Sequence, residues 1–313
     1  MISLQIITII LQVLFIPLFS PLLIGIIRKI KARLQNREGA SILQPYFDLL
    51  KLFRKDEVIS GDASWIFRVA PFIVFGVTML IGASIPIFSL VTTYIPSGDF
   101  LVIMYLFVLG TFFLALAGMD TGSGFGGFGS SREMMIAALA EGGLLFSLLI
   151  PSIAAETTNV VGMVAVLQYF SLIQLLPIFI AFLAFFIALL AENSRFPVDN
   201  PATHLELTMV HEAMILEYSG KRLALMEWAA ANKLLIFIAL GANLFFPWGI
   251  GSDFGFFTII VSLGIFALKA FGFALSIALL ESTIAKFRIF RVPDLLFTSL
   301  VLGMIALGII ITI

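Results

Sequence analysis

Long apolar runs are the feature that most constrains the fold of this chain. Each run is near the roughly 20 residues that a helix needs to cross a bilayer core of about 30 Å. The runs lack the apolar-polar alternation of membrane barrel strands, which are only about 10 residues long. We therefore predict an all-α polytopic membrane protein with eight spans, approximately Ser3 to Ile27, Ile66 to Leu90, Phe100 to Gly118, Glu133 to Ile153, Ser171 to Ala191, Leu223 to Phe246, Phe254 to Leu280 and Pro293 to Ile313.

Composition agrees with that class and narrows the functions. Of the 313 residues, 61% are hydrophobic and 12% charged, whereas soluble domains carry about 25% charged residues. The net charge of -1 lacks the clustered basic excess that nucleic-acid phosphates require. Cysteine is absent, so the chain has no thiolate for a disulfide or an iron-sulfur cluster. We expect a single integral membrane domain, residues 1–313, without a cofactor of its own.

Lysine and arginine are segregated between the two ends of the predicted bundle. Nine lie in the first connection and its edges, and seven more lie in the third, fifth and seventh connections. The even connections and both termini have none, and the remaining two, Lys233 and Lys269, lie within apolar runs. Since basic loops stay in the cytoplasm, we predict a cell-membrane protein with its odd connections inside and both termini outside.

The first connection, residues 28–65, is long and amphipathic. Its segment LQPYFDLLKLF places apolar side chains at helical spacing, at Leu43, Phe47, Leu50 and Phe53. A helix with such an apolar face lies flat in the membrane interface. We therefore expect a surface helix from Leu43 to Phe53.

The fifth connection, residues 192–222, is the most polar part of the chain. Asn200 is a good N-cap before Pro201, and Gly220 can end a helix in a left-handed turn. Such a helix would place two acids on one face, together with Val210 and Ala213. A solvated loop is the simple alternative, but acids that alternate with apolar residues favour burial under a partner. We interpret the segment as an acidic coupling loop, with candidate residues Glu192, Asp199, Glu206, Glu212 and Glu217.

Two local motifs bear on chemistry and on helix boundaries. His211 and Glu212 begin an HExxH-like string, but Ile215 replaces the second histidine, so no zinc site is expected. Ser130 and Glu133 form a capping box, which predicts that the fourth helix opens there. The preceding glycines suit a close approach of backbone to a neighbouring helix.

Charged residues inside the predicted spans are candidates for function. Glu141 lies about 14 Å beyond Arg132 along a helix, and Lys269 about 18 Å from Glu281, so both approach the bilayer centre. A charge at that depth is costly and usually has a role. We hypothesise that Glu133 and Glu141 begin an inward carboxylate path, with Lys269 as counter-charge. The alternative is a static ion pair that fixes two helices.

Several segments resemble a known family of membrane subunits. They are ARLQNREGASILQPYFDLLKLFRKDEV (Ala32 to Val58), FRVAP (Phe67 to Pro71), ENSRFPVDNP (Glu192 to Pro201), LEYSG (Leu216 to Gly220) and LLESTIAKFRIFRVPD (Leu279 to Asp294). This pattern is similar to the membrane subunit shared by respiratory complex I and the membrane-bound nickel-iron hydrogenases. MDTGSGFGGFGSSREMM (Met119 to Met135) and LESTIAKFR are closer to the formate hydrogenlyase and energy-converting hydrogenase branch.

The resemblance implies roles for individual residues. It places Glu192, Arg195, Asp199, Glu206 and Glu217 in a cytoplasmic loop that faces the electron-transfer arm, and Glu141 on an intramembrane path. In complex I this subunit frames the quinone chamber and begins the proton path, whereas the hydrogenase relatives keep the frame without a quinone. A docking surface for hydrophilic subunits would then comprise Arg33, Arg37, Asp48, Lys51 and Arg195.

These observations lead to one functional hypothesis with three alternatives. The chain is expected to be a non-catalytic subunit that anchors a nickel-iron and iron-sulfur module and couples its redox chemistry to proton or sodium translocation through antiporter-like subunits. Nickel-iron and iron-sulfur clusters would then belong to the partner subunits. A quinone-chamber subunit of complex I, a stand-alone ion transporter and a passive anchor remain open, as does the choice between proton and sodium.

Overall fold

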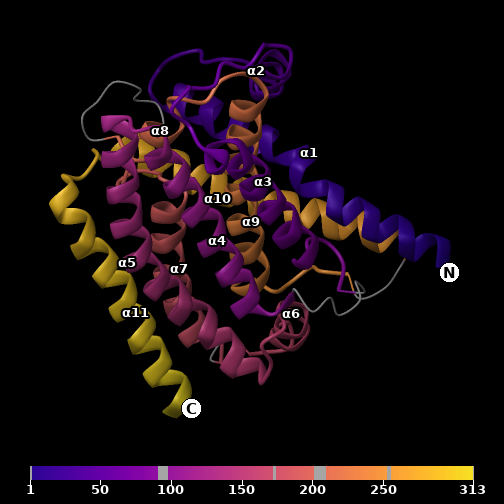
Figure 1. Ribbon diagram of the computed structural model, residues 1–313. Coiled ribbons are helices and arrows are strands. Elements are labelled where there is room, and N and C mark those ends of the chain that lie inside the picture. Colours follow the sequence, from indigo (N-terminus) through magenta and orange to yellow (C-terminus); the bar gives the residue numbers. More distant parts are fainter. Residues whose placement is uncertain (1, 91–97, 172–173, 201–208, 252–254, 313) are drawn as a thin grey trace.

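The structure is a computed structural model that describes residues 2–90, 98–171, 174–200, 209–251 and 255–312. Within these ranges the fold is a bundle of tilted helices (Figure 1). Eight of the described helices are long and apolar: α1 (Ile2–Leu34), α3 (Trp65–Ser84), α4 (Phe100–Asp120), α5 (Gly124–Ala155), α7 (Leu176–Glu192), α9 (Gly220–Leu244), α10 (Phe256–Thr283) and α11 (Val292–Thr312). Four short ones connect them: α2 (Gln44–Phe53), α6 (Val160–Leu167), α8 (His211–Ile215) and η2 (Ile289–Arg291).

Helix α9 is the centre of the bundle. It packs against α1, α3, α7 and α10, while α5, α7 and α11 pack against one another on one side (Figure 1). From Leu234 to Leu244 every residue of α9 is buried, as expected of a helix that is surrounded by protein. Helices α2 and α8 lie at the same end of the bundle, which we call the α2/α8 end (Figure 1).

The predicted membrane spans agree with the helices in number and order. Seven of the described helices are long and apolar enough to cross a membrane. The eighth, α7, is apolar but has only 17 residues, close to the lower limit of about 17 for a span. The all-α prediction is therefore confirmed, with one span at the short limit.

The fourth span starts earlier than the capping box predicts. Helix α5 begins at Gly124, and the hydroxyl of Ser130 donates to the carbonyl oxygens of Ala115, at 2.9 Å, and Gly126, at 2.8 Å. A Cβ atom on Gly126 would lie 2.1 Å from the carbonyl oxygen of Gly118. The glycines are thus helical because they let α5 cross closely over α4, and the capping-box prediction is wrong.

The amphipathic helix of the first connection is confirmed. Helix α2 begins one residue later than expected, and its apolar side chains Leu43, Phe47 and Leu50 are exposed. On the inner side Pro45 is buried, and the hydroxyl of Tyr46 donates to the carbonyl oxygen of Leu18 in α1. The exposed face is of the kind that a membrane interface would cover.

The long helix expected in the fifth connection is not present in its described part. Helix α8 covers only His211–Ile215, and residues 201–208 lie outside the described ranges. Val210 has a non-helical backbone, and its N–H donates to the Asp199 carboxylate at 3.2 Å. Gly220 does adopt a left-handed conformation, with φ of 55°, but there it opens α9. A tertiary contact to Asp199 thus overrides local helix propensity.

Candidate functional site

A cavity of about 510 Å³ lies inside the bundle towards the α2/α8 end. Its apolar wall comes from α1, α3, α4 and α9, including Ile24, Val77, Phe107 and Leu234. The opposite wall is ionic, because five carboxylates and five basic groups line it together with His211. They are Glu133, Glu192, Glu212, Glu227, Glu281, Arg28, Lys31, Arg37, Arg195 and Lys233. Since the formal charges balance, the cavity can exchange protons without holding a large net charge.

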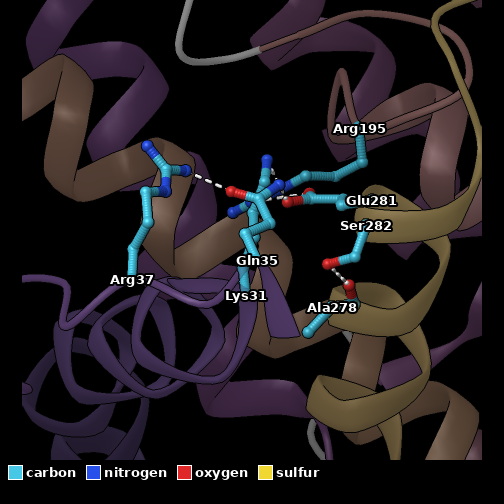
Figure 2. Close-up of polar contacts among 7 residues, drawn as sticks. All are labelled: Lys31, Gln35, Arg37, Arg195, Ala278, Glu281 and Ser282. Carbon is cyan, nitrogen blue, oxygen red and sulfur yellow. Dashed lines mark hydrogen bonds and ion pairs between the residues drawn. The ribbon is translucent and has the colours of Figure 1, made fainter. Parts of the chain in front are cut away.

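Glu281, at the end of α10, is held by two cations (Figure 2). Its Oε2 lies 3.0 Å from Lys31 Nζ of α1, and its Oε1 lies 3.1 Å from Arg195 Nη1. Beside this triad, the Arg37 guanidinium donates to the side-chain oxygen of Gln35 (Figure 2). The Glu281 side chain is 2% exposed, and removing one partner of such a buried pair costs about 3–5 kcal/mol. The triad therefore fastens the fifth connection to α1 and α10.

Glu192 forms a second buried ion pair in the cavity wall. Its Oε2 accepts from Lys233 Nζ of α9 at 2.8 Å. Its Oε1, like Oδ1 of the adjacent Asn193, has no hydrogen-bond partner among the described residues. An unsatisfied buried acceptor costs about 1–3 kcal/mol, and both residues line a cavity with room for water,. The site is thus suited to hydration around a carboxylate.

The two polar residues at the start of α8 respond to burial in opposite directions. Burial raises the pKa of Glu212 to about 7, and the neighbouring acids Glu227 and Asp199 raise it further, against Arg28. Burial, with Lys233 beside it, lowers the pKa of His211 to about 4. At neutral pH His211 is uncharged, whereas Glu212 is close to half ionised. Glu212 is therefore the residue of α8 that takes up or releases protons near pH 7.

Asp199 and Arg195 have structural positions that differ from their expected ones. Asp199 is buried, and its carboxylate accepts from Lys286 Nζ at 2.8 Å and from the N–H groups of Val210 and His211. It fixes the start of α8 and does not line the cavity. Arg195 is only 9% exposed, so its assignment to an exposed docking surface is wrong. It belongs to the cavity wall because Glu281 holds it there.

The two carboxylates predicted on one helix, Glu133 and Glu141, both project from α5 but lie in different hollows. Glu133 is 4% exposed and lines the ionic cavity. Glu141 is partly buried and lines a separate groove of about 290 Å³ between α4 and α5. The structure thus places these two members of the hypothesised path in neighbouring spaces.

Three other candidates lie outside the cavity or outside the described ranges. Glu217 is exposed, so the expected acidic stripe with Glu206 does not form, because α8 ends before it. Glu206 itself is outside the described residues. The Lys269 ammonium donates to the carbonyl oxygen of Phe246 at 2.6 Å, and no described carboxylate forms an ion pair with it. The expected counter-charge role of Lys269 is wrong.

The remaining docking candidates lie at the α2/α8 end. Arg33, Arg37 and Lys51 are exposed, and Arg37 also reaches the cavity. Asp48 is partly buried and accepts from the Gln44 amide at 2.9 Å within α2. Three basic side chains are thus accessible to a partner, while Asp48 serves its own helix.

Sequence reasoning missed several groups that line the cavity: Arg28, Lys31, Glu227, Lys233 and Glu281. Lys233 and Glu227 did carry a signal, since they interrupt an apolar run. Lys31 and Glu281 are 250 residues apart. No local pattern pairs such distant residues, so only the packing of α1 against α10 reveals their contact.

Comparisons with known proteins identify the family. A family model described as NADH dehydrogenase matches residues 5–313. The chain belongs to this family. Formate hydrogenlyase subunit 4 of Escherichia coli (strain K12) is 33% identical over 274 residues, which cover 88% of each chain. Hydrogenase-4 component C of the same strain is 32% identical, over 88% of this chain and 87% of that one.

A more distant family member and a solved structure extend the comparison. An NADH-quinone oxidoreductase subunit of Paraburkholderia xenovorans (strain LB400) is 29% identical, over 81% of this chain and 73% of that one. A chain in the structure of the membrane-bound sulfane sulfur reductase, an archaeal respiratory membrane complex, has the same fold. Its TM-score is 0.80 at 21% identity, with 96% of this chain and 98% of that chain covered. Family membership and the apolar helices together make this a multi-pass membrane protein.

Proposed function

We propose that this chain is the membrane anchor and coupling subunit of a membrane-bound, hydrogenase-type respiratory complex. The observation that carries the proposal is the buried ionic cavity, because a passive anchor has no need of five carboxylates in its interior. The identity of 33% to formate hydrogenlyase subunit 4 supports the hydrogenase branch. Nickel-iron and iron-sulfur clusters would be carried by hydrophilic partner subunits, and antiporter-like subunits would adjoin the bundle within the membrane.

The coupling step is electrostatic. A unit charge that arrives about 10 Å away contributes about 1.7 kcal/mol at an effective dielectric constant of about 20. That energy shifts a pKa by about 1.2 units. Glu212, whose pKa is raised to about 7, would then change its protonation substantially near neutral pH. Electron arrival beside the cavity thereby drives proton uptake into it.

The orientation belongs to the same proposal. Residues 28–65 and 192–222, which contain most of the lysines and arginines, would face the cytoplasm and meet the hydrophilic module. Exposed Arg33, Arg37 and Lys51 support that arrangement, because they offer basic groups to an acidic partner surface. Both termini would then lie on the outer side of the cell membrane.

Replacement of Glu133 tests the function, with Glu217 as matched control. In inverted membrane vesicles, Glu133→Gln is expected to keep hydrogen evolution from a reduced viologen dye and to lose ion translocation. Glu217→Gln should keep both, because Glu217 is exposed outside the cavity. Translocation at the normal ratio in Glu133→Gln would contradict the proposal.

Isolation of the complex separates this function from the alternatives. A coupling subunit is expected to co-purify with iron-sulfur partners and to be inactive alone. Ion transport by the isolated chain would indicate a stand-alone transporter. A passive anchor would show only reduced stability, with unchanged coupling, when Glu133 is replaced.

A further inference from the structure

The ionic cavity and the lateral groove are separate spaces with one residue in common among those described. Glu133 lines the cavity, and Glu141 lines the groove between α4 and α5. Tyr105, also on the groove, is 73% exposed, so the groove opens towards the outside of the bundle. Within the described ranges Thr111 of α4 is the residue that lines both spaces. It is 6% exposed and forms part of the wall between them.

The register of α4 against α5 places Thr111 between the two carboxylates. The Ser130 hydroxyl of α5 donates to the carbonyl oxygen of Ala115 of α4, and the two helices run antiparallel. One turn back along α4 from Ala115 is Thr111, and one turn forward along α5 from Ser130 is Met134. Thr111 is therefore level with the turn that follows Glu133 and precedes Glu141.

A direct proton transfer between the two carboxylates is too long without a relay. Eight residues of α-helix rise about 12 Å, whereas a proton crosses a hydrogen bond of about 3 Å or passes through a water. A threonine hydroxyl both donates and accepts, so it can hand on a proton without a net change.

The Thr111 hydroxyl is also free of the usual backbone contact. In the other helices, hydroxyls such as those of Ser84, Ser276 and Thr298 donate to the carbonyl oxygen four residues earlier. No such bond is found for Thr111 within the described part of the chain. Its hydroxyl is therefore available to the two spaces that it borders.

We propose that the Thr111 hydroxyl is the proton relay between the ionic cavity and the lateral groove. A proton from the Glu133 side, carried by water, binds Thr111 Oγ as the original hydroxyl proton leaves towards Glu141. Glu133 ends one charge more negative and Glu141 one charge less, so the charges balance. This inference rests on the proposed function, since it assigns a route to the ions that the complex moves.

A matched pair of variants tests the relay. Thr111→Val keeps the shape and removes the hydroxyl, whereas Thr111→Ser keeps the hydroxyl. In vesicles of the intact complex, Thr111→Val is expected to lower the ratio of protons moved to hydrogen formed about tenfold or more. Thr111→Ser should retain most of the ratio. Because the ratio counts only assembled complexes, a lower yield does not obscure the result, and Thr111→Ala provides a second variant if valine prevents assembly.

The outcomes separate this inference from the proposed function. If Glu141→Gln abolishes coupling while Thr111→Val couples normally, the relay is wrong and the coupling function stands. If both variants couple normally, the proposed function fails as well. A coupling loss that Thr111→Ser shares equally would indicate a packing role and would also overturn the relay. A larger solvent deuterium isotope effect on proton uptake in Thr111→Ser than in the unmodified complex is expected when the hydroxyl proton takes part.

Discussion

At the residue scale, Glu212 shows how the environment of one carboxylate sets its chemistry. It lies in α8 beside the cavity, where Glu227 and Asp199 add negative charge and Arg28 opposes them. Burial and these acids raise its pKa from 4.5 to about 7. Protonation is thus favoured by the folded state, and the ionised form destabilises it.

The pH dependence of stability follows from that shift. Between pH 4.5 and 7 the folded state binds a proton that the unfolded chain releases, so the contribution of Glu212 to stability falls as pH rises through this window,. Glu212→Gln should remove that slope and leave the variant relatively more stable above pH 7. The melting temperature of the detergent-purified complex, recorded from pH 5 to pH 8 for both proteins, measures the difference. Parallel curves for the two would contradict the assignment.

At the element scale, the crossing of α4 and α5 decides where the cavity wall lies. Ser130 and the glycines of α5 bring its first turns against Gly118 and Ala115 of α4. That contact places Glu133 towards the ionic cavity and Glu141 towards the lateral groove. The close approach of these two helices therefore positions the candidate path.

Two adjacent glycines test that crossing. Gly126→Ala would put a Cβ atom 2.1 Å from the Gly118 carbonyl oxygen, while a Cβ on Gly127 meets nothing within 4 Å. Gly126→Ala is expected to destabilise the protein by about 1–3 kcal/mol, as overpacking does, and to lower coupling. Gly127→Ala should be neutral or slightly stabilising, because alanine favours a helix. Thermal unfolding of the purified complexes compares them, and equal losses would contradict the crossing.

The same elements show which features a sequence can predict. Span number, order and the amphipathic α2 follow from apolar length and periodicity, which are local properties. The start of α5 and the short α8 do not, because Gly118 and Asp199 act on them from other segments. Glu133, Glu192 and Glu212 were predicted as candidates from their chemistry. Their partners, such as Lys233 and Glu281, depend on helix packing, so the cavity as a whole was not predictable.

At the scale of the whole molecule, the bundle places titratable groups between a charged end and the membrane-spanning core. Ion pairs from α1, α7, α9 and α10 fix the ionic wall, and α8 closes it. The groove with Glu141 lies further along α5, where a neighbouring membrane subunit would cover it. This arrangement suits a subunit that converts a nearby electron transfer into proton movement across the family's membrane fold.

The central claim is that protons leave this chain through Glu141. The most direct measurement is the number of ions translocated per hydrogen formed, in vesicles that contain the intact complex with Glu141→Gln. The expected result is hydrogen formation at the normal rate from a reduced dye, with a translocation ratio near zero. An unchanged ratio in that variant would contradict the claim.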